Sequence, residues 1–277
     1  MDALEDQYRD GLAALVAEGN SAELDGLLKQ CPAAANCTIT SEDGVTGPAV
    51  YVALRTGKIS AARVLLEHGA RADFTAPDGI PLIYYTLGID DMQHVSAKAD
   101  RETLFTLAVK NGADIEAQDS HGMTALMRTC FLGTGHIFDF LLDHGASPNP
   151  APNSKGYTPL MLAVISGKGA MIDRLLEAGA DVNARNAEGN TPLHFTRIAA
   201  TALRLIDAGA NHACISNSGR GAIERLRPEQ RKLVMDGLQE RWAAECETFR
   251  DEADQLCHKP VTAVAAKRLK LKIPTTS

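Results

Sequence analysis

The chain has 277 residues, 45% of them hydrophobic, and its 28 basic and 35 acidic side chains give a formal net charge of −7. Residues 1–254 hold 23 basic and all 35 acidic side chains, so an acidic body of −12 precedes a basic tail. This body disfavours nucleic acid and favours a partner protein with a basic surface. The lack of an N-terminal apolar core and of long apolar runs argues against a Sec signal peptide and a membrane span. Six scattered cysteines without a CxxC pair are typical of free thiols in the cytoplasm.

A repeat of about 30 to 43 residues runs through most of the chain. A Gly-Ala pair closes an apolar helical run at Gly69, Gly112, Gly145, Gly179 and Gly209. A second glycine opens the units at Gly44, Gly79, Gly122, Gly156, Gly189 and Gly219. The spacings between successive glycines change in the same way in both sets, so we interpret the chain as a repeat protein. The expected units are a divergent one at about 10–42, then 43–77, 78–120, 121–154, 155–187 and 188–217, with a polar cap at 218–242.

Three units depart from the common pattern. The N-terminal unit has Cys31-Pro32 in place of Gly-Ala. The unit at 78–120 has about ten extra residues near 88–99, which form either a neutral connection or a functional loop. Asp100 is then expected to be the N-cap of the second helix, and Tyr85, which replaces a small residue, predicts altered packing. The unit at 188–217 is about three residues short near 197–201.

The unit at 155–187 shows the expected local structure most clearly. Thr158 is placed to cap a first helix that begins at Pro159, where the missing N–H of proline costs nothing. Gly167 ends this helix, and apolar residues at helical spacing over 171–176 predict a second one. Gly179 suits the left-handed position after it. Each unit is therefore expected to hold two short helices and a turn.

Three motifs in this region resemble the ankyrin-repeat family: TPLM at 158–161, TPLH at 191–194 and GADVNA at 179–184. The resemblance covers roughly residues 10–242. It implies an all-α solenoid of about seven units, with short β-hairpin fingers and a concave binding surface. It also implies a non-catalytic scaffold that binds a partner protein, as a regulator, inhibitor or adaptor.

The resemblance further indicates which residues contact the partner. They occupy the variable positions of the fingers and inner helices rather than the structural ones. These residues are Arg55, Gln118, His121, Met123, Phe131, Tyr157, Ile165, Arg185 and Asn190. Large side chains such as Phe131 and Tyr157 would be natural anchors.

Residues 228–257 read as one long helix, with apolar side chains spaced three or four apart from Met235 through Leu238 and Trp242 to Leu256. The helix either packs on the last unit as an extended cap, or it forms a dimer or docks another protein. The tail at 259–277 is basic and alternates over 268–273, which suits a solvated segment or a strand added on binding. The segment 243–277 as an effector or dimerisation element is therefore an alternative function, and export by a non-Sec route an alternative location.

No pattern in the sequence predicts catalysis, a cofactor or a metal. His121, Cys130, His136 and His144 have spacings that match no zinc site. The run Ser166–Gly169 lacks the first glycine and the final Ser/Thr of a phosphate loop. His194 is expected to make structural hydrogen bonds, and Cys246 and Cys257 to pack on a helix face. A site assembled across helices from distant residues remains the third alternative.

Overall fold

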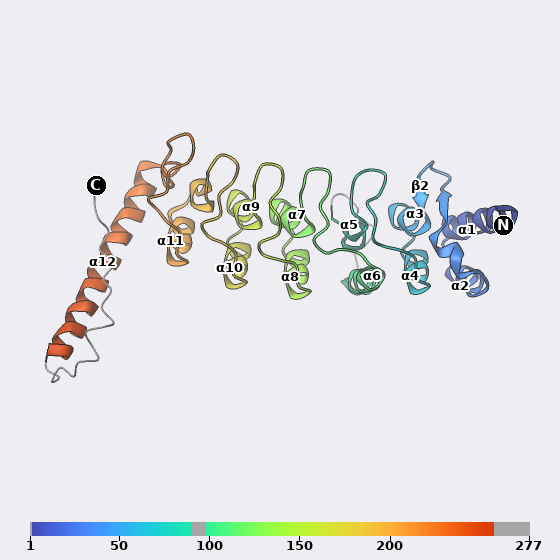
Figure 1. Ribbon diagram of the computed structural model, residues 1–277, viewed down its shortest axis with the longest axis horizontal. Coiled ribbons are helices and arrows are strands. Elements are labelled where there is room, and N and C mark those ends of the chain that lie inside the picture. Colours follow the sequence, from blue (N-terminus) through green and yellow to red (C-terminus); the bar gives the residue numbers. More distant parts are fainter. Residues whose placement is uncertain (1, 90–97, 258–277) are drawn as a thin grey trace.

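The computed structural model describes residues 2–89 and 98–257 as an elongated stack of helix pairs (Figure 1). The first helices of the central pairs form the middle row: α3 (Ala49–Arg55), α5 (Leu82–Leu87), α7 (Ala125–Leu132) and α9 (Pro159–Ile165). The second helices form the lower row: α4 (Ile59–Glu67), α6 (Lys98–Lys110), α8 (Gly135–Asp143), α10 (Gly169–Glu177) and α11 (Ala199–Asp207). Finger loops project along the opposite edge. The predicted all-α solenoid is confirmed.

The N-terminal unit is larger than expected. Its first helix, α1 (Asp2–Glu18), begins before the expected start at about residue 10, and α2 (Ser21–Gln30) follows. The short 3-10 helix η1 (Pro32–Asn36) then leads into β1 (Thr38–Thr40). This strand pairs antiparallel with β2 (Thr46–Pro48), with Ile39 opposite Gly47, and forms the first finger.

The later fingers are held by one side-chain oxygen at the same position of each turn. Backbone N–H groups two and four residues further on donate to it, as in an Asx turn. The acceptors are Asp119, Asn153 and Asn186, at N···O distances of 2.8 to 3.1 Å, and Ser216, which receives the N–H four residues on at 3.2 Å. The fingers are therefore specified locally, before any contact between units.

The expected helix boundaries of the unit at 155–187 are confirmed. The Thr158 hydroxyl accepts the N–H of Met161 at 3.4 Å, and α9 begins at Pro159. Gly179 has a φ of +83°, in the left-handed region that glycine adopts without strain.

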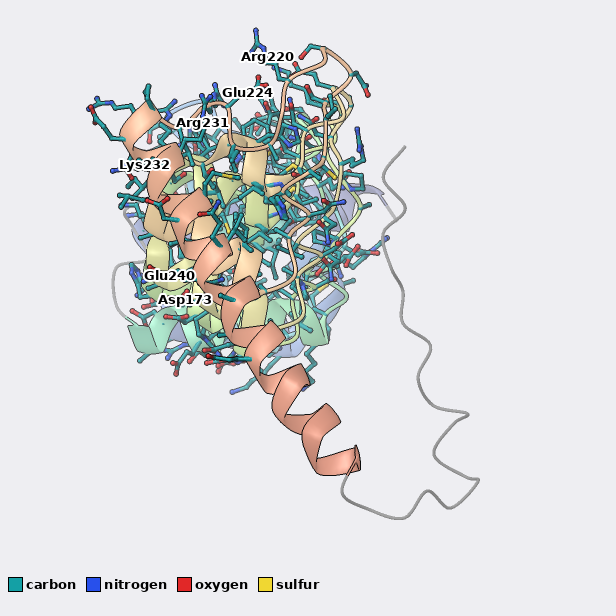
Figure 2. All side chains as sticks on the ribbon, turned by 90° about the vertical axis from the view of Figure 1, so that its left-hand side faces the viewer. Asp173, Arg220, Glu224, Arg231, Lys232 and Glu240 are labelled. Atoms are coloured by element: carbon teal, nitrogen blue, oxygen red, sulfur yellow. The ribbon has the colours of Figure 1, made fainter. Side chains whose placement is uncertain are left out.

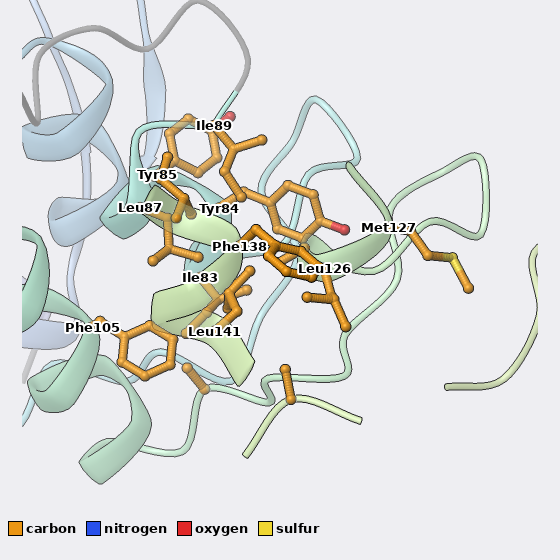
Figure 3. Close-up of a cluster of buried hydrophobic side chains, with 14 of the residues drawn as sticks. Ile83, Tyr84, Tyr85, Leu87, Ile89, Phe105, Leu126, Met127, Phe138 and Leu141 are labelled. Atoms are coloured by element: carbon orange, nitrogen blue, oxygen red, sulfur yellow. The ribbon is translucent and has the colours of Figure 1, made fainter. Parts of the chain in front are cut away.

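The unit at 78–120 differs from the expectation at the start of its second helix. Helix α6 begins at Lys98, so Asp100 lies inside the first turn and the N-cap prediction is wrong. Tyr85, where altered packing was predicted, is buried in a cluster of hydrophobic side chains (Figure 3). Its ring meets that of Tyr51 edge-on at a centroid distance of 5.3 Å, and its hydroxyl donates to Asp78. Burial, together with the Asp78 carboxylate, raises the pKa of Tyr85. Residues 90–97 of the insertion lie outside the described part.

The short unit at 188–217 loses its first helix. A single 3-10 turn, η2 (Pro192–Phe195), stands where the other units have a full α-helix. The three missing residues are thus lost from the first helix and its connection. The second helix is not shortened, because α11 has nine residues, as α8 and α10 do.

The last helix, α12 (Pro228–Cys257), has the predicted bounds and extends past the lower row of helices (Figure 1). It packs on α11 through Val234, which is fully buried, and through Gly237, where an added Cβ would lie 3.3 Å from Leu203. Met235, expected in the buried seam, is 43% exposed. That prediction is wrong by one residue, because the neighbouring Val234 is the buried one. Leu238, the next residue of the expected seam, is partly buried against the core. The side chains of the seam from Trp242 to Leu256, and the tail from 258 on, lie outside the described residues.

Candidate functional site

The nine residues expected to contact a partner do not all lie free on the surface. Phe131 is 56% exposed near the end of α7, and Ile165 is half-buried at the end of α9. Arg55 and His121 are exposed on α3 and on a finger. The finger loops run along the stack beside the row of first helices (Figure 1), and we call the surface that these two sets of elements share the groove.

Three of the nine are engaged in contacts between units. The Gln118 amide donates to the carbonyl of Ala151 at 2.9 Å, and Arg185 donates to the carbonyl of Ile215 at 2.9 Å. Each of these bonds joins one finger to the next. Met123 packs against the core, and its carbonyl accepts the Tyr84 hydroxyl at 2.5 Å. The structure thus gives these three residues a role in stacking the units.

Tyr157 and Asn190 lie together at a hollow of about 370 Å³ near the C-terminal end of the groove. The Tyr157 ring lies 5.6 Å from that of Phe195, and the Arg225 guanidinium stands 5.7 Å from the centre of the Phe195 ring. Arg220, Glu188 and Glu224 complete the polar part of the lining. Sequence reasoning missed Phe195, because a residue directly after TPLH reads as core.

A row of apolar side chains, exposed at Phe131 and Ile198 and half-buried at Ile165, crosses the ends of the first helices in consecutive units. Phe131 and Ile165 are 34 residues apart, and Ser166 donates to the carbonyl of Phe131 at 3.1 Å, so the two helix ends are neighbours. Ile198, in the matching connection of the next unit, is 56% exposed. Gln230 of α12 accepts the N–H of Ala199 at 2.7 Å, which brings the first turns of α12 beside Ile198.

Charge is distributed unevenly between the two edges of the solenoid. Second-helix arginines pair with acids of the preceding unit: Arg174 with Asp143 at 3.1 Å, Arg204 with Asp173 at 3.0 Å, and Arg241 with Asp207. Figure 2 shows Arg220, Arg231 and Lys232 with the acid Glu224 toward the finger edge, and Asp173 and Glu240 toward the opposite edge. The acids of the second helices are therefore largely paired, away from the groove, whereas Glu188 and Glu224 line the hollow.

One buried ion pair underlies a finger. Arg128 donates to Asp119 at 2.6 Å, and the Asp119 side chain is only 1% exposed. The same carboxylate accepts the N–H groups of His121 and Met123 at 2.8 and 2.9 Å. Because burial of a charge is costly without such partners, this pair belongs to the support of the groove rather than to its surface.

The histidines and cysteines have structural surroundings. The Nδ1 atom of His194 accepts the N–H of Thr191 at 3.0 Å, and its Nε2 lies 3.2 Å from the Arg220 carbonyl, which confirms the expected structural role. Burial lowers the pKa of His194, and it raises that of the Cys130 thiol. His121 lies on a finger and His136 on α8, whereas Cys130 is buried in α7. Within residues 2–89 and 98–257, no three such side chains converge as metal ligands would.

Comparison with known proteins identifies the repeat. The family model for ankyrin repeats (3 copies) matches residues 92–186. The fold is similar to the crystallised ankyrin repeat domain of Bcl-3, a unique member of the IkappaB protein family, with a TM-score of 0.63 and 22% identity over 82% of this chain and 97% of that one. It is also similar to an ankyrin repeat domain from Acinetobacter baumannii AYE, with a TM-score of 0.57 and 24% identity over 73% and 98% of the two chains. No curated protein gives a significant match.

Proposed function

Because this chain belongs to the ankyrin-repeat family, we propose that it is a non-catalytic scaffold that binds a partner protein in the groove between its fingers and first helices. The observation that carries this proposal is the apolar row of exposed Phe131 and Ile198 with half-buried Ile165 between them, together with the hollow at Tyr157 and Phe195. Aligned apolar side chains left in water on successive units are typical of interaction surfaces. Ankyrin repeats generally act as interaction modules, which supports the same role.

The test is capture of partners on the full chain, followed by affinity measurements with substituted chains. We expect joint replacement of Phe131, Tyr157 and Ile198 by alanine to weaken the captured complex about a hundredfold, as for anchors at the centre of an interface. Joint replacement of Arg63 and Glu177 by alanine is the control, because both are exposed on second helices. Equal affinities of the groove variant and the control would contradict the proposal.

The first two turns of α12 support a second candidate function. Leu233 and Met235, on either side of the buried Val234, are 55% and 43% exposed, and the helix continues beyond the solenoid (Figure 1). They would suit dimerisation through 228–257, or docking of an effector partner together with the tail. Light scattering of the full chain tests the dimer, with replacement of both residues by aspartate as the disrupting variant. A monomeric mass for the unsubstituted chain would rule out this dimer.

The expected charge of the partner, the expected lack of catalysis and the expected location stay predictions. A partner with a basic surface would contact the acids of the second helices or those of residues 1–120. Residues 1–120 contain 19 acidic and 9 basic side chains. No pattern in the sequence predicts catalysis, a cofactor or binding of nucleic acid, so we expect none of the three. None of the helices within residues 2–257 that the structure describes has the length and apolarity to cross a bilayer. A cytoplasmic location, or export by a non-Sec route, remains a prediction from sequence.

A further inference from the structure

The C-terminal half of the groove has a charge opposite to that of the whole chain. Residues 121–235 hold 12 basic and 9 acidic side chains, and five of those nine acids are on α8, α10 and α11. The groove side of this half is therefore basic, although the chain as a whole carries −7. The potential that a partner segment meets here is set by nearby side chains, because distant charges are screened within about 8 to 10 Å.

Exposed cations stand on both margins of the apolar floor. Lys168 lies against Gly133 in the connection beside Phe131, and Arg197 directly precedes Ile198. On the finger margin, Arg220 and Arg225 line the hollow. None of these four cations takes part in an ion pair with another described residue.

Two acids are present on the same surface and limit how far its charge extends. Glu188 and Glu224 both line the hollow at the finger margin, where Glu188 accepts the Asn190 amide at 2.9 Å. Arg185 adds a further positive charge on this margin, although it is bound to the Ile215 carbonyl. No acid of residues 121–235 lies on the first helices or in their connections to α8, α10 and α11, so these elements carry only cations on the opposite margin, although exposed Glu229 follows in the first turn of α12.

We propose that this part of the groove, defined by Phe131, Tyr157, Ile165, Phe195 and Ile198 with the cations Lys168, Arg197, Arg220 and Arg225, binds a protein segment that combines apolar anchors with acidic flanks. The inference rests on the proposed function and specifies its partner. Apolar side chains of the segment fill the row and the hollow, and its carboxylates form ion pairs with the four cations on either margin. Such pairing sets specificity and on-rate, whereas the apolar anchors supply most of the affinity.

The test uses a displayed library of random peptides of roughly 16 residues, selected on the full chain. A helix of that length spans ~24 Å, or about three units at an interhelical spacing of 8–10 Å. Binders retained by the unsubstituted chain but lost with the Phe131→Ala, Tyr157→Ala, Ile198→Ala variant are groove-dependent. We expect these to contain apolar residues and an excess of Asp and Glu over Lys and Arg.

Charge reversal in the groove then tests the cations directly. Joint Lys168→Glu, Arg197→Glu and Arg225→Glu replacement should weaken the selected peptides by about tenfold or more, and their affinity should fall with salt. The matched control is Arg63→Glu with Lys110→Glu, two exposed reversals on α4 and α6, which should change the affinity less than about twofold. Thermal melts of each variant show that it is folded.

The failures of the two proposals are distinguishable. Groove-dependent peptides that are neutral or basic, or that are unaffected by the reversal, would overturn this inference and leave the groove as a binding site. Selection that yields only peptides indifferent to the Phe131, Tyr157 and Ile198 variant would overturn both.

Discussion

Buried charge and close backbone approaches in this scaffold depend on a few single residues. The positions that matter most are not the exposed ones expected to contact a partner but those beneath them. Asp119 and Gly156 illustrate this, because each holds a finger through contacts that the sequence pattern does not display.

Asp119 occupies the position that Asn153 and Asn186 hold in the next two units. Replacement by alanine removes both the finger caps and the partner of Arg128, and we expect a loss of about 3–5 kcal/mol in the free energy of unfolding. Replacement by asparagine keeps the caps and should cost clearly less. Urea unfolding of both variants measures this, and equal losses would show that the ion pair alone matters.

Gly156 and Gly179 form a matched pair. Both have positive φ, +77° and +83°, so alanine at either should cost about 1–2 kcal/mol in backbone strain. A Cβ at Gly156 would also lie 2.7 Å from the backbone nitrogen of Ala187 in the next finger, whereas a Cβ at Gly179 meets nothing within 4 Å. We therefore expect Gly156→Ala to lower the melting temperature more than Gly179→Ala. The reverse order in calorimetry would contradict the close approach of the two fingers.

Much at the residue scale could be predicted because turn and cap chemistry is local. Thr158, Pro159 and Gly179 were identified from their neighbours alone. Gln118 and Arg185 were predicted as partner contacts because exposure is visible in a repeat pattern, whereas their bonds to Ala151 and Ile215 depend on how units stack. The same holds for Phe195, which is only 6% exposed and whose place at the hollow depends on its packing against Tyr157 and Arg225.

At the scale of elements, α12 acts as an added layer on the end of the stack. Its bounds were predictable from its length and from Pro228 at the first turn. Its contact face was not, because apolar spacing alone does not choose between Val234 and Met235. The Arg241–Asp207 pair continues onto α12 the series that Arg174 and Arg204 form on the second helices.

The docking of α12 is tested by two substitutions on adjacent residues. Val234 is fully buried, so Val234→Ala should cost about 2 kcal/mol of unfolding free energy. Leu233 is 55% exposed, so Leu233→Ala should change stability by less than about 0.5 kcal/mol. Denaturant unfolding of the two variants compares them. A larger effect at Leu233 would mean that the opposite face of α12 is the packed one.

At the scale of the whole molecule, the repeat determines both the shape and the distribution of charge. The spacing of about 34 residues between landmark glycines was enough to predict a solenoid, because each unit buries its apolar face only against its neighbours. The net charge was a poor guide to the groove, since it averages an acidic N-terminal half with residues 121–235, where five of the nine acids lie on the second helices. Only the folded chain separates these two surfaces.

Hydrogen–deuterium exchange of the full chain with and without its captured partner tests the groove as the binding site most directly. Binding in the groove should slow exchange in α7, α9 and η2 and in the fingers between them, and leave α8, α10 and α11 unchanged. Protection confined to the second helices or to α12, with α7, α9 and η2 exchanging as in the free chain, would contradict the account.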